Sequence, residues 1–531
     1  MQPEVLDALQ SGALLLTANR RLQRVARAAF DQAQLAAGCT VWEPARIQAW
    51  SDWVERCWLD LPAGRRRGEL LSAAEEQLLW ETVIAGAATA ETLLDLAATA
   101  RAAARAWELR HAWALDLAAT PDATAETEAF RGWATHFQDR CRVHGWVTAA
   151  ELPAVLGRNL AAVALPARVL LQGWNAPTPQ LTALVEALRR AGATVAFLAA
   201  APPAGEWRQV ALADPEAEML QAAHWSRGHL EAGANNIGVI VPDLGVRRAQ
   251  VERVFASVLY PGSVPPEGER CFNLSLGRPL SEYPVVAAAL QLLAGLAGER
   301  GLDEVGPWLR SPFLGGALTE QGPRALLDAA LRRHGEAALT LAGLAKTAKC
   351  PLLLRQHITA AQVRLPQGEQ WPGEWVLCFN GLLEALGWPG EQALGSSEYQ
   401  TVEAWTTALH AFGRLEQVAR VAGERWRFAE ALSRLRSVAA ATIFQPESGP
   451  APIQVLGVLE AAGLRFSHLW VTGLHDTAWP PAAAPNPFLS RDLQRRLGLP
   501  ASSATEQMRY AHEIMQGWSA DTVVLSYARQ E

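Results

Sequence analysis

Hydrophobic residues along this chain fall into two kinds of pattern. Short, continuous apolar runs bounded by turn residues are typical of strands buried in a parallel sheet, and apolar residues three and four positions apart are typical of amphipathic helices. The runs predict strands at Ala13–Thr17, Arg168–Leu171, Thr194–Ala199, Asn236–Pro242, Ile453–Leu456, His468–Thr472 and Val523–Ser526.

Helical spacing predominates between these strands. Asn19–Ala37, Pro179–Ala191 and Glu216–Glu231 each predict a single helix, whereas residues 47–160 and 285–445 predict two long, all-helical insertions. We therefore predict an α/β protein with two parallel-sheet domains, each interrupted by a large helical insertion. The first sheet domain combines residues 1–46 with 161–205, and the second combines residues 206–284 with 446–531.

The stretch Ile453–Pro480 concentrates unusual residues in the loops that follow its two predicted strands. Ligands of open parallel sheets bind outside the carboxyl ends of the strands, so these loops form a candidate site. A structural alternative stays open, in which the two glycines are turns and the tryptophan fills the core. The residues in question are Glu460, Gly463, Arg465, Gly473, Asp476 and Trp479.

Composition narrows the class of protein. A chain of 531 residues with a net charge of −7 is long enough for several domains and is not a globally basic nucleic-acid binder. Local cationic patches remain compatible with DNA binding, because counterion release needs only a few well-placed cations. The six cysteines have no C-x-x-C spacing, and no apolar run is long enough for a membrane helix. We expect a cytoplasmic protein with reduced thiols and no metal centre.

The segment after Ile453 resembles the late-motif region of UvrD-like helicase domains in the AddB/RexB and RecB-like group of helicase-nuclease proteins. In that group a strand, an E-x-x-G-L-x-F loop, a strand and a G-L-x-(D/E)-x-x-(W/F)-P segment recur. The resemblance is also strong around Ile237–Pro284 and weak in the two helical insertions, and it covers nearly the whole chain. The matching residues here are Glu460, Gly463, Leu464, Phe466, Gly473, Leu474, Asp476, Trp479 and Pro480, followed by Asn486–Arg491 and the closing run to Arg529.

The resemblance implies a superfamily 1 helicase fold, with two RecA-like domains, and a role in recombinational repair of DNA double-strand breaks. Comparison with this group also shows where the chain differs from an active, ATP-hydrolysing helicase. A phosphate-binding loop reads G-x-x-x-x-G-K-(S/T), but the first strand here leads directly through Thr17 and Asn19 into a helix. Where an active ATPase carries an Asp-Glu pair for Mg²⁺ and water, this chain has Asn175 and Ala176. The site implied by the resemblance is thus degenerate.

Two functions compete at this point. The first is a helicase-shaped scaffold that binds DNA without turning over nucleotide, and the alternative is an active ATP-dependent helicase or translocase. Both lysines of the chain, Lys346 and Lys349, lie in a helical Ala/Leu stretch without loop glycines, which favours the scaffold. The resemblance further implies an AddA- or UvrD-like helicase subunit as a partner. We also expect a PD-(D/E)XK nuclease domain to follow Glu531, with Mg²⁺ required only there.

The predicted DNA contacts are cationic and aromatic residues near strand ends. Single-stranded or end-bearing DNA is expected to touch the loops that follow the strands of both sheets. For the arginines of Asn19–Ala37, a solvated helix face remains an alternative to a phosphate contact. The candidate DNA-binding residues are Arg20, Arg247, Arg248, Arg465 and Trp479.

Overall fold

The computed structural model describes residues 2–530, except 63, 67, 88–92, 118–123, 175, 199–204, 266–268, 335–337, 448–450, 462–463 and 477. The chain forms two compact units. The first unit contains both large sheets, and the second is mainly helical. The first comprises Met1–Ser72, Trp80–Leu276 and Gly449–Glu531, and the second comprises Ala73–Leu79 and Gly277–Ser448.

The first sheet of unit 1 has four parallel strands, in the order β2-β1-β5-β6. Its central strand β1 is buried on both faces, which explains its three consecutive leucines. The edge strand β2 lies within residues predicted to be helical. That prediction is wrong at this point, because a three-residue strand is too short to show a period. The strands are β1 (Leu14–Thr17), β2 (Ile47–Ala49), β5 (Arg168–Gln172) and β6 (Thr194–Leu198).

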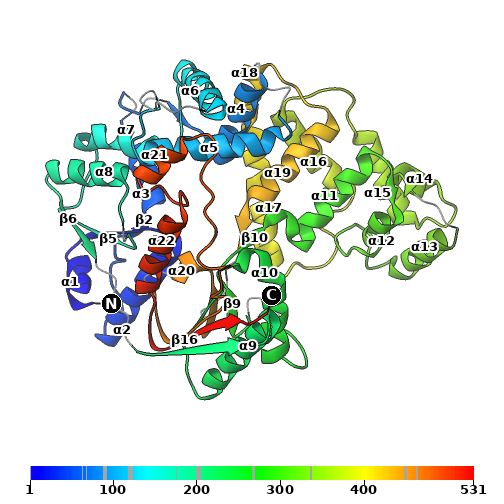
Figure 1. Cartoon of the computed structure of the whole chain (residues 1–531). Coiled ribbons are helices and arrows are strands. Elements are labelled where there is room, and N and C mark those ends of the chain that lie inside the picture. Colours follow the sequence, from blue (N-terminus) through cyan, green and yellow to red (C-terminus); the bar gives the residue numbers. More distant parts are fainter. Residues whose placement is uncertain are drawn as a thin grey trace. The chain divides into compact units, whose positions relative to one another are not determined.

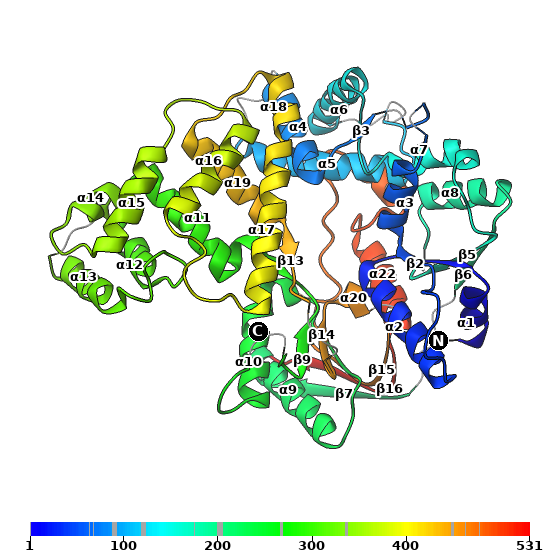
Figure 2. The same cartoon turned by 180° about the vertical axis from the view of Figure 1, so that it is seen from behind.

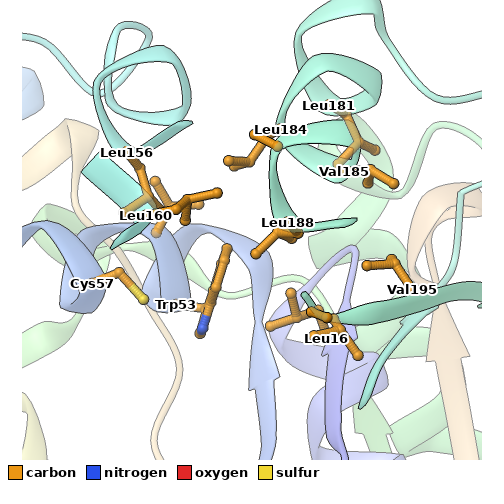
Figure 3. Packing of buried hydrophobic residues seen from close by; sticks show 14 of the residues in the cluster. Leu16, Trp53, Cys57, Leu156, Leu160, Leu181, Leu184, Val185, Leu188 and Val195 are labelled. Atoms are coloured by element: carbon orange, nitrogen blue, oxygen red, sulfur yellow. The ribbon is translucent and has the colours of Figure 1, made fainter. Parts of the chain in front are cut away.

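Helices cover both faces of this four-stranded sheet. On one face, Trp53 of α3, Leu156 of α7 and Leu188 of α8 pack against Leu16 and Val195 of the strands, as Figure 3 shows. On the other face, α1 and α2 pack against β1, β2 and β5. These helices are α1 (Pro3–Gln10), α2 (Arg20–Ala36), α3 (Trp50–Leu59), α7 (Leu152–Asn159) and α8 (Pro179–Arg190).

The second sheet of unit 1 has six parallel strands, in the order β7-β16-β15-β8-β14-β9. The strands β14 and β15 are neighbours in sequence, but β8 lies between them. The strand predicted at Val523–Ser526 lies within β16, which pairs with β15 on one side and β7 on the other. The strands are β7 (Glu206–Leu212), β8 (Ile237–Ile240), β9 (Phe272–Leu274), β14 (Ile453–Leu456), β15 (Arg465–Val471) and β16 (Ser519–Ala528).

Helices also cover both faces of the six-stranded sheet. The pair α9 (Pro215–Glu231) and α10 (Leu244–Leu259) packs on one face. On the other face lie α20 (Val458–Ala461) and α22 (Ala504–Gln516), together with Leu22 from α2. Both views of the chain show α20 and α22 next to α2 (Figures 1 and 2). The two sheets of unit 1 therefore share a packed contact through α2.

The remaining helices of unit 1 complete its helical layer. Their ends follow simple local rules: Asp95 and Thr124 cap the first turns of α5 and α6, and Gly145 ends α6 in the left-handed conformation at φ 67°. These helices are α5 (Leu96–Ala112), α6 (Ala125–His144) and α21 (Arg491–Arg496), and the short strands β3 (Glu69–Leu70) and β4 (Trp146–Val147) pair in parallel.

Unit 2 contains the residues predicted as the second helical insertion, 285–445, and two small antiparallel pairs, β10 with β13 and β11 with β12. The helix α4 (Ala73–Ala85) is divided between the units. No helix in the described ranges has the length and apolar content to cross a membrane. The other elements are β10 (Arg278–Pro279), α11 (Pro284–Ala297), β11 (Arg300–Gly301), α12 (Leu302–Arg310), α13 (Gln321–His334), β12 (Ala338–Leu339), α14 (Leu341–Lys346), α15 (Leu352–Arg364), α16 (Pro372–Ala385), α17 (Ser396–Arg414), α18 (Glu416–Ala422), α19 (Phe428–Ala441) and β13 (Ile443–Phe444).

Candidate functional site

The turn between β1 and α2 occupies the position at which a phosphate-binding loop would leave the first sheet. Thr17 is fully buried, and its hydroxyl donates to the carbonyl of Asn19 at 2.9 Å. The Asn19 side chain accepts from the Leu22 N–H at 2.8 Å and so caps α2. The Ala18 N–H donates to the Gln172 carbonyl at 2.9 Å. The Thr17 hydroxyl, the Asn19 side chain and the Ala18 N–H therefore all form hydrogen bonds within the protein.

The loop that follows β5 begins at Gly173 and lies against this turn. Gly173, directly after β5, has φ +95°, and a Cβ placed there would lie 2.6 Å from Leu22 Cδ1 and 3.0 Å from Ala18 Cβ. Glycine is needed both for the backbone conformation and for the close approach. Ala176 follows as an exposed residue, while Asn175 lies outside the described residues. A Cβ at position 173 would therefore collide with Leu22 and Ala18, while Ala18 and Gly173 themselves stay exposed to solvent.

The first turn of α2 also contacts the six-stranded sheet. Arg21 donates from Nη2 to Gln454 Oε1 of β14 at 2.5 Å, and Leu22 packs among apolar residues that include Leu456 and Trp479. Burial, with the positive charge of Arg24, lowers the pKa of Arg21 to about 10, and Glu460 of α20 acts in the opposite direction. A cation thus lies between the first turn of α2 and strand β14 and interacts with protein groups.

A buried polar network anchors the loop that follows β15. Glu218 of α9 is fully buried, and its Oε1 accepts from the Gly473 N–H at 2.9 Å and from the Ser526 hydroxyl at 2.5 Å. The Ser526 oxygen accepts in turn from Trp470 Nε1 at 2.8 Å. Gly473 has φ +67°, which favours glycine. The sequence analysis missed Glu218 and Ser526, because their partners are far away in sequence and no local spacing connects them.

Trp479 belongs to the core of unit 1. Its side chain is 9% exposed, and its ring lies 6.0 Å from that of Tyr510 and 6.5 Å from that of Trp518. The prediction that it contacts DNA is therefore corrected, because the indole faces are covered by protein. Pro480 follows through a cis peptide bond, and Asp476 in the same loop is exposed. Gly463 lies outside the described residues.

Two arginines that were predicted to contact DNA instead bind protein groups beside the second sheet. Arg248 is 7% exposed and donates to the Leu276 carbonyl at 2.9 Å and to Glu252 at 3.0 Å. The Arg247 side chain is 13% exposed and donates to the Pro215 carbonyl at 2.9 Å. Because backbone carbonyls and a carboxylate already bind these guanidinium groups, the structure contradicts their prediction as phosphate contacts.

Arg465 lies at the opposite edge of the sheet from the one predicted. It is the first residue of β15 and pairs with Ser519 at the start of β16, so it belongs to the amino ends of the strands. The prediction placed the beginning of this strand at His468, which shifted Arg465 into a loop. Its guanidinium forms an exposed ion pair with Asp521 at 3.1 Å. Arg529 directly follows β16 at the carboxyl edge and is exposed.

Arg20 remains a candidate for phosphate binding. It starts α2 at the carboxyl edge of the four-stranded sheet, and its side chain is 75% exposed although it pairs with Asp52 at 2.9 Å. This hydrogen-bonded pair raises the pKa of Arg20 and lowers that of Asp52. An exposed ion pair of this kind contributes only about 0–1 kcal/mol, so a phosphate can compete for the guanidinium. Arg24, one turn later, is exposed as well.

Neither the known family models nor the curated proteins gave a match to this chain. Among the residues that the structure describes, no group of three or more His, Cys, Asp or Glu is arranged to hold a metal ion.

Proposed function

We propose that this chain is the helicase-shaped, DNA-binding part of an AddB-like helicase-nuclease protein of double-strand break repair, and that it binds DNA without hydrolysing ATP. The two parallel sheets then correspond to two RecA-like domains, and strand cleavage with Mg²⁺ belongs to a nuclease domain outside these residues. An AddA- or UvrD-like helicase subunit is the proposed partner, and it would supply the ATP-driven movement.

The observation that carries the proposal is the turn between β1 and α2, whose polar groups form hydrogen bonds within the protein. A nucleotide phosphate needs free backbone N–H groups beside a glycine loop. Here the Asn19 side chain caps the helix, and Gly173 packs against Ala18 and Leu22. Arg21 reaches Gln454 across the same region. These contacts favour a scaffold over a motor, because the Leu22 N–H is already bonded and the turn has no glycine at which a phosphate could approach the backbone.

The support for DNA binding comes from the sequence resemblance and from the exposed cations at the start of α2. Arg20 and Arg24 lie four residues apart on one helix, so their side chains lie on the same face. Each arginine that neutralises a single-strand phosphate contributes about 0.7 to the slope of log K against log salt. At about 0.1 M salt this corresponds to roughly fivefold in affinity for each contact.

The test measures DNA binding and ATP hydrolysis on the same purified protein. We expect a fluorescent single strand to bind equally well with and without ATP in the same Mg²⁺-containing buffer, and we expect no DNA-stimulated ATP hydrolysis. Replacing Arg20 and Arg24 by Gln should weaken binding about 25-fold at 0.1 M salt. ATP hydrolysis that copurifies with the chain would support the alternative, an active translocase. A protein that does not bind DNA at all would refute the proposal.

A further inference from the structure

The helix α21 carries a concentration of positive charge that plays no part in the site described above. Its six residues include Arg491, Arg495 and Arg496, all of them exposed. No side chain or backbone group in the described ranges pairs with these three guanidinium groups. In contrast, Arg509 on the following helix α22 pairs with both Glu506 and Glu513.

A buried glutamine holds α21 in place. Gln494 is 0% exposed and donates from Nε2 to the carbonyls of Asn486 and Leu489, both at 2.8 Å. Its Oε1 accepts from the Asn486 N–H at 2.9 Å. All polar atoms of this side chain are therefore used to hold the loop before α21 against the helix. The arginines on the outer side of the helix project from a fixed backbone.

The loop before α21 is attached to the helical layer of unit 1. Asn486 donates from Nδ2 to the Ala102 carbonyl of α5 at 3.0 Å. Phe488 stacks on Phe130 at 6.0 Å and meets Trp133 edge-on at 5.3 Å. Figure 1 shows α21 near α5, to which the hydrogen bond between Asn486 and Ala102 ties the preceding loop.

The helix dipole favours only some of the arginines on α21. Arg495 and Arg496 lie in the last turn of α21, where cations interact favourably with the helix dipole. Arg491 is the first residue of the helix, where the dipole disfavours a cation, and Asp492 is the only acidic residue on the helix. The helix dipole therefore does not favour Arg491 at this position, in a protein of net charge −7. An anionic ligand would explain it.

We propose that α21 forms a surface that binds the phosphodiester backbone of single-stranded DNA. This inference rests on the proposed function and identifies an additional contact surface for the same ligand. Guanidinium groups bind phosphate oxygens with two parallel hydrogen bonds, and the four-residue spacing of Arg491 and Arg495 places them about 6 Å apart along the helix. An acidic protein partner would also need an apolar centre of contact. Leu497, 47% exposed, is the single large apolar side chain exposed along 491–497.

The experiment compares two triple variants with equal loss of charge. The first changes Arg491, Arg495 and Arg496 to Gln. The control changes Arg190, Arg253 and Arg333 to Gln, three exposed arginines on other helices. Loss of three single-strand contacts should lower the slope of log K against log salt by about 2 and weaken binding about 100-fold at 0.1 M salt. The control should change the affinity less than threefold, and both variants should keep the wild-type melting temperature.

Each outcome decides a separate point. If the α21 variant keeps the wild-type affinity and salt slope while the wild type binds DNA, this inference is wrong and the proposed function stands. Equal weakening by both triple variants would mean that only net charge matters, which also overturns it. Displacement of DNA by polyglutamate as readily as by an unlabelled strand would show a general polyanion surface instead of a phosphodiester site. A wild type that does not bind DNA removes the proposed function and this inference together.

Discussion

Replacing Trp479 by Ala tests whether this residue is a core side chain or a base-stacking platform. The side chain is 9% exposed and lies against Tyr510 and Trp518. A buried tryptophan covers roughly 150–250 Å² of apolar surface, and its truncation in a core typically costs about 3–5 kcal/mol. We therefore expect Trp479→Ala to lower the melting temperature of unit 1 by about 5–10 °C.

A phenylalanine at the same position gives a sharper comparison. The indole Nε1 of Trp479 is buried and has no hydrogen-bond partner within the described ranges. An unpaired buried donor costs about 1–3 kcal/mol, and Trp479→Phe removes it together with some packing area. The two effects oppose each other, so this variant should stay within about 1 kcal/mol of wild type.

The assay combines thermal unfolding, followed by circular dichroism, with DNA titration well below the melting temperature. Folded Trp479→Ala should bind single-stranded DNA within about twofold of wild type, because the ring does not reach the ligand. Unchanged melting with DNA affinity reduced more than tenfold would refute the core assignment. Destabilisation of Trp479→Phe as large as that of Trp479→Ala would show that the indole N–H has a partner.

Two further predictions concern the β1–α2 turn and a histidine pair. Gly173→Ala should lower the free energy of unfolding by about 1–3 kcal/mol more than Gly192→Ala does. Both glycines have positive φ, but only a Cβ at Gly173 would have neighbours closer than 4 Å. Equal losses of stability in urea unfolding would show that the turn has room for a Cβ. His229 stacks on His468 at 3.9 Å, and burial, with the charge of His468, lowers the pKa of His229. The unfolded chain therefore binds a proton more readily, so the stability is complete above about pH 6.5 and falls as the pH drops below it. His229→Phe should flatten this fall, while His136→Phe at an exposed position should leave it unchanged; a wild-type profile that is level from pH 7 to 5 would contradict the assignment.

Local sequence patterns determined where most of the long elements lie. The apolar runs at Leu14–Thr17, Ile237–Ile240 and Ile453–Leu456 are strands, because residues buried on both faces of a parallel sheet leave a continuous hydrophobic stretch. The N-cap of α2 at Asn19 follows from local chemistry as well. In contrast, β2 and β7 escaped prediction. The strand β2 is very short, and β7 is an edge strand without a fully buried residue.

The neighbours of each strand and the use of each arginine depended on the tertiary structure. Nothing in the local pattern places β8 between β14 and β15, because strand order is set by packing between segments distant in sequence. The local sequence does not show whether Arg248 and Arg491 are buried or exposed. Only the folded chain buries the first beside the Leu276 carbonyl and leaves the second in solvent. An arginine's role depends on whether distant segments supply it with acceptors, which the sequence alone does not specify.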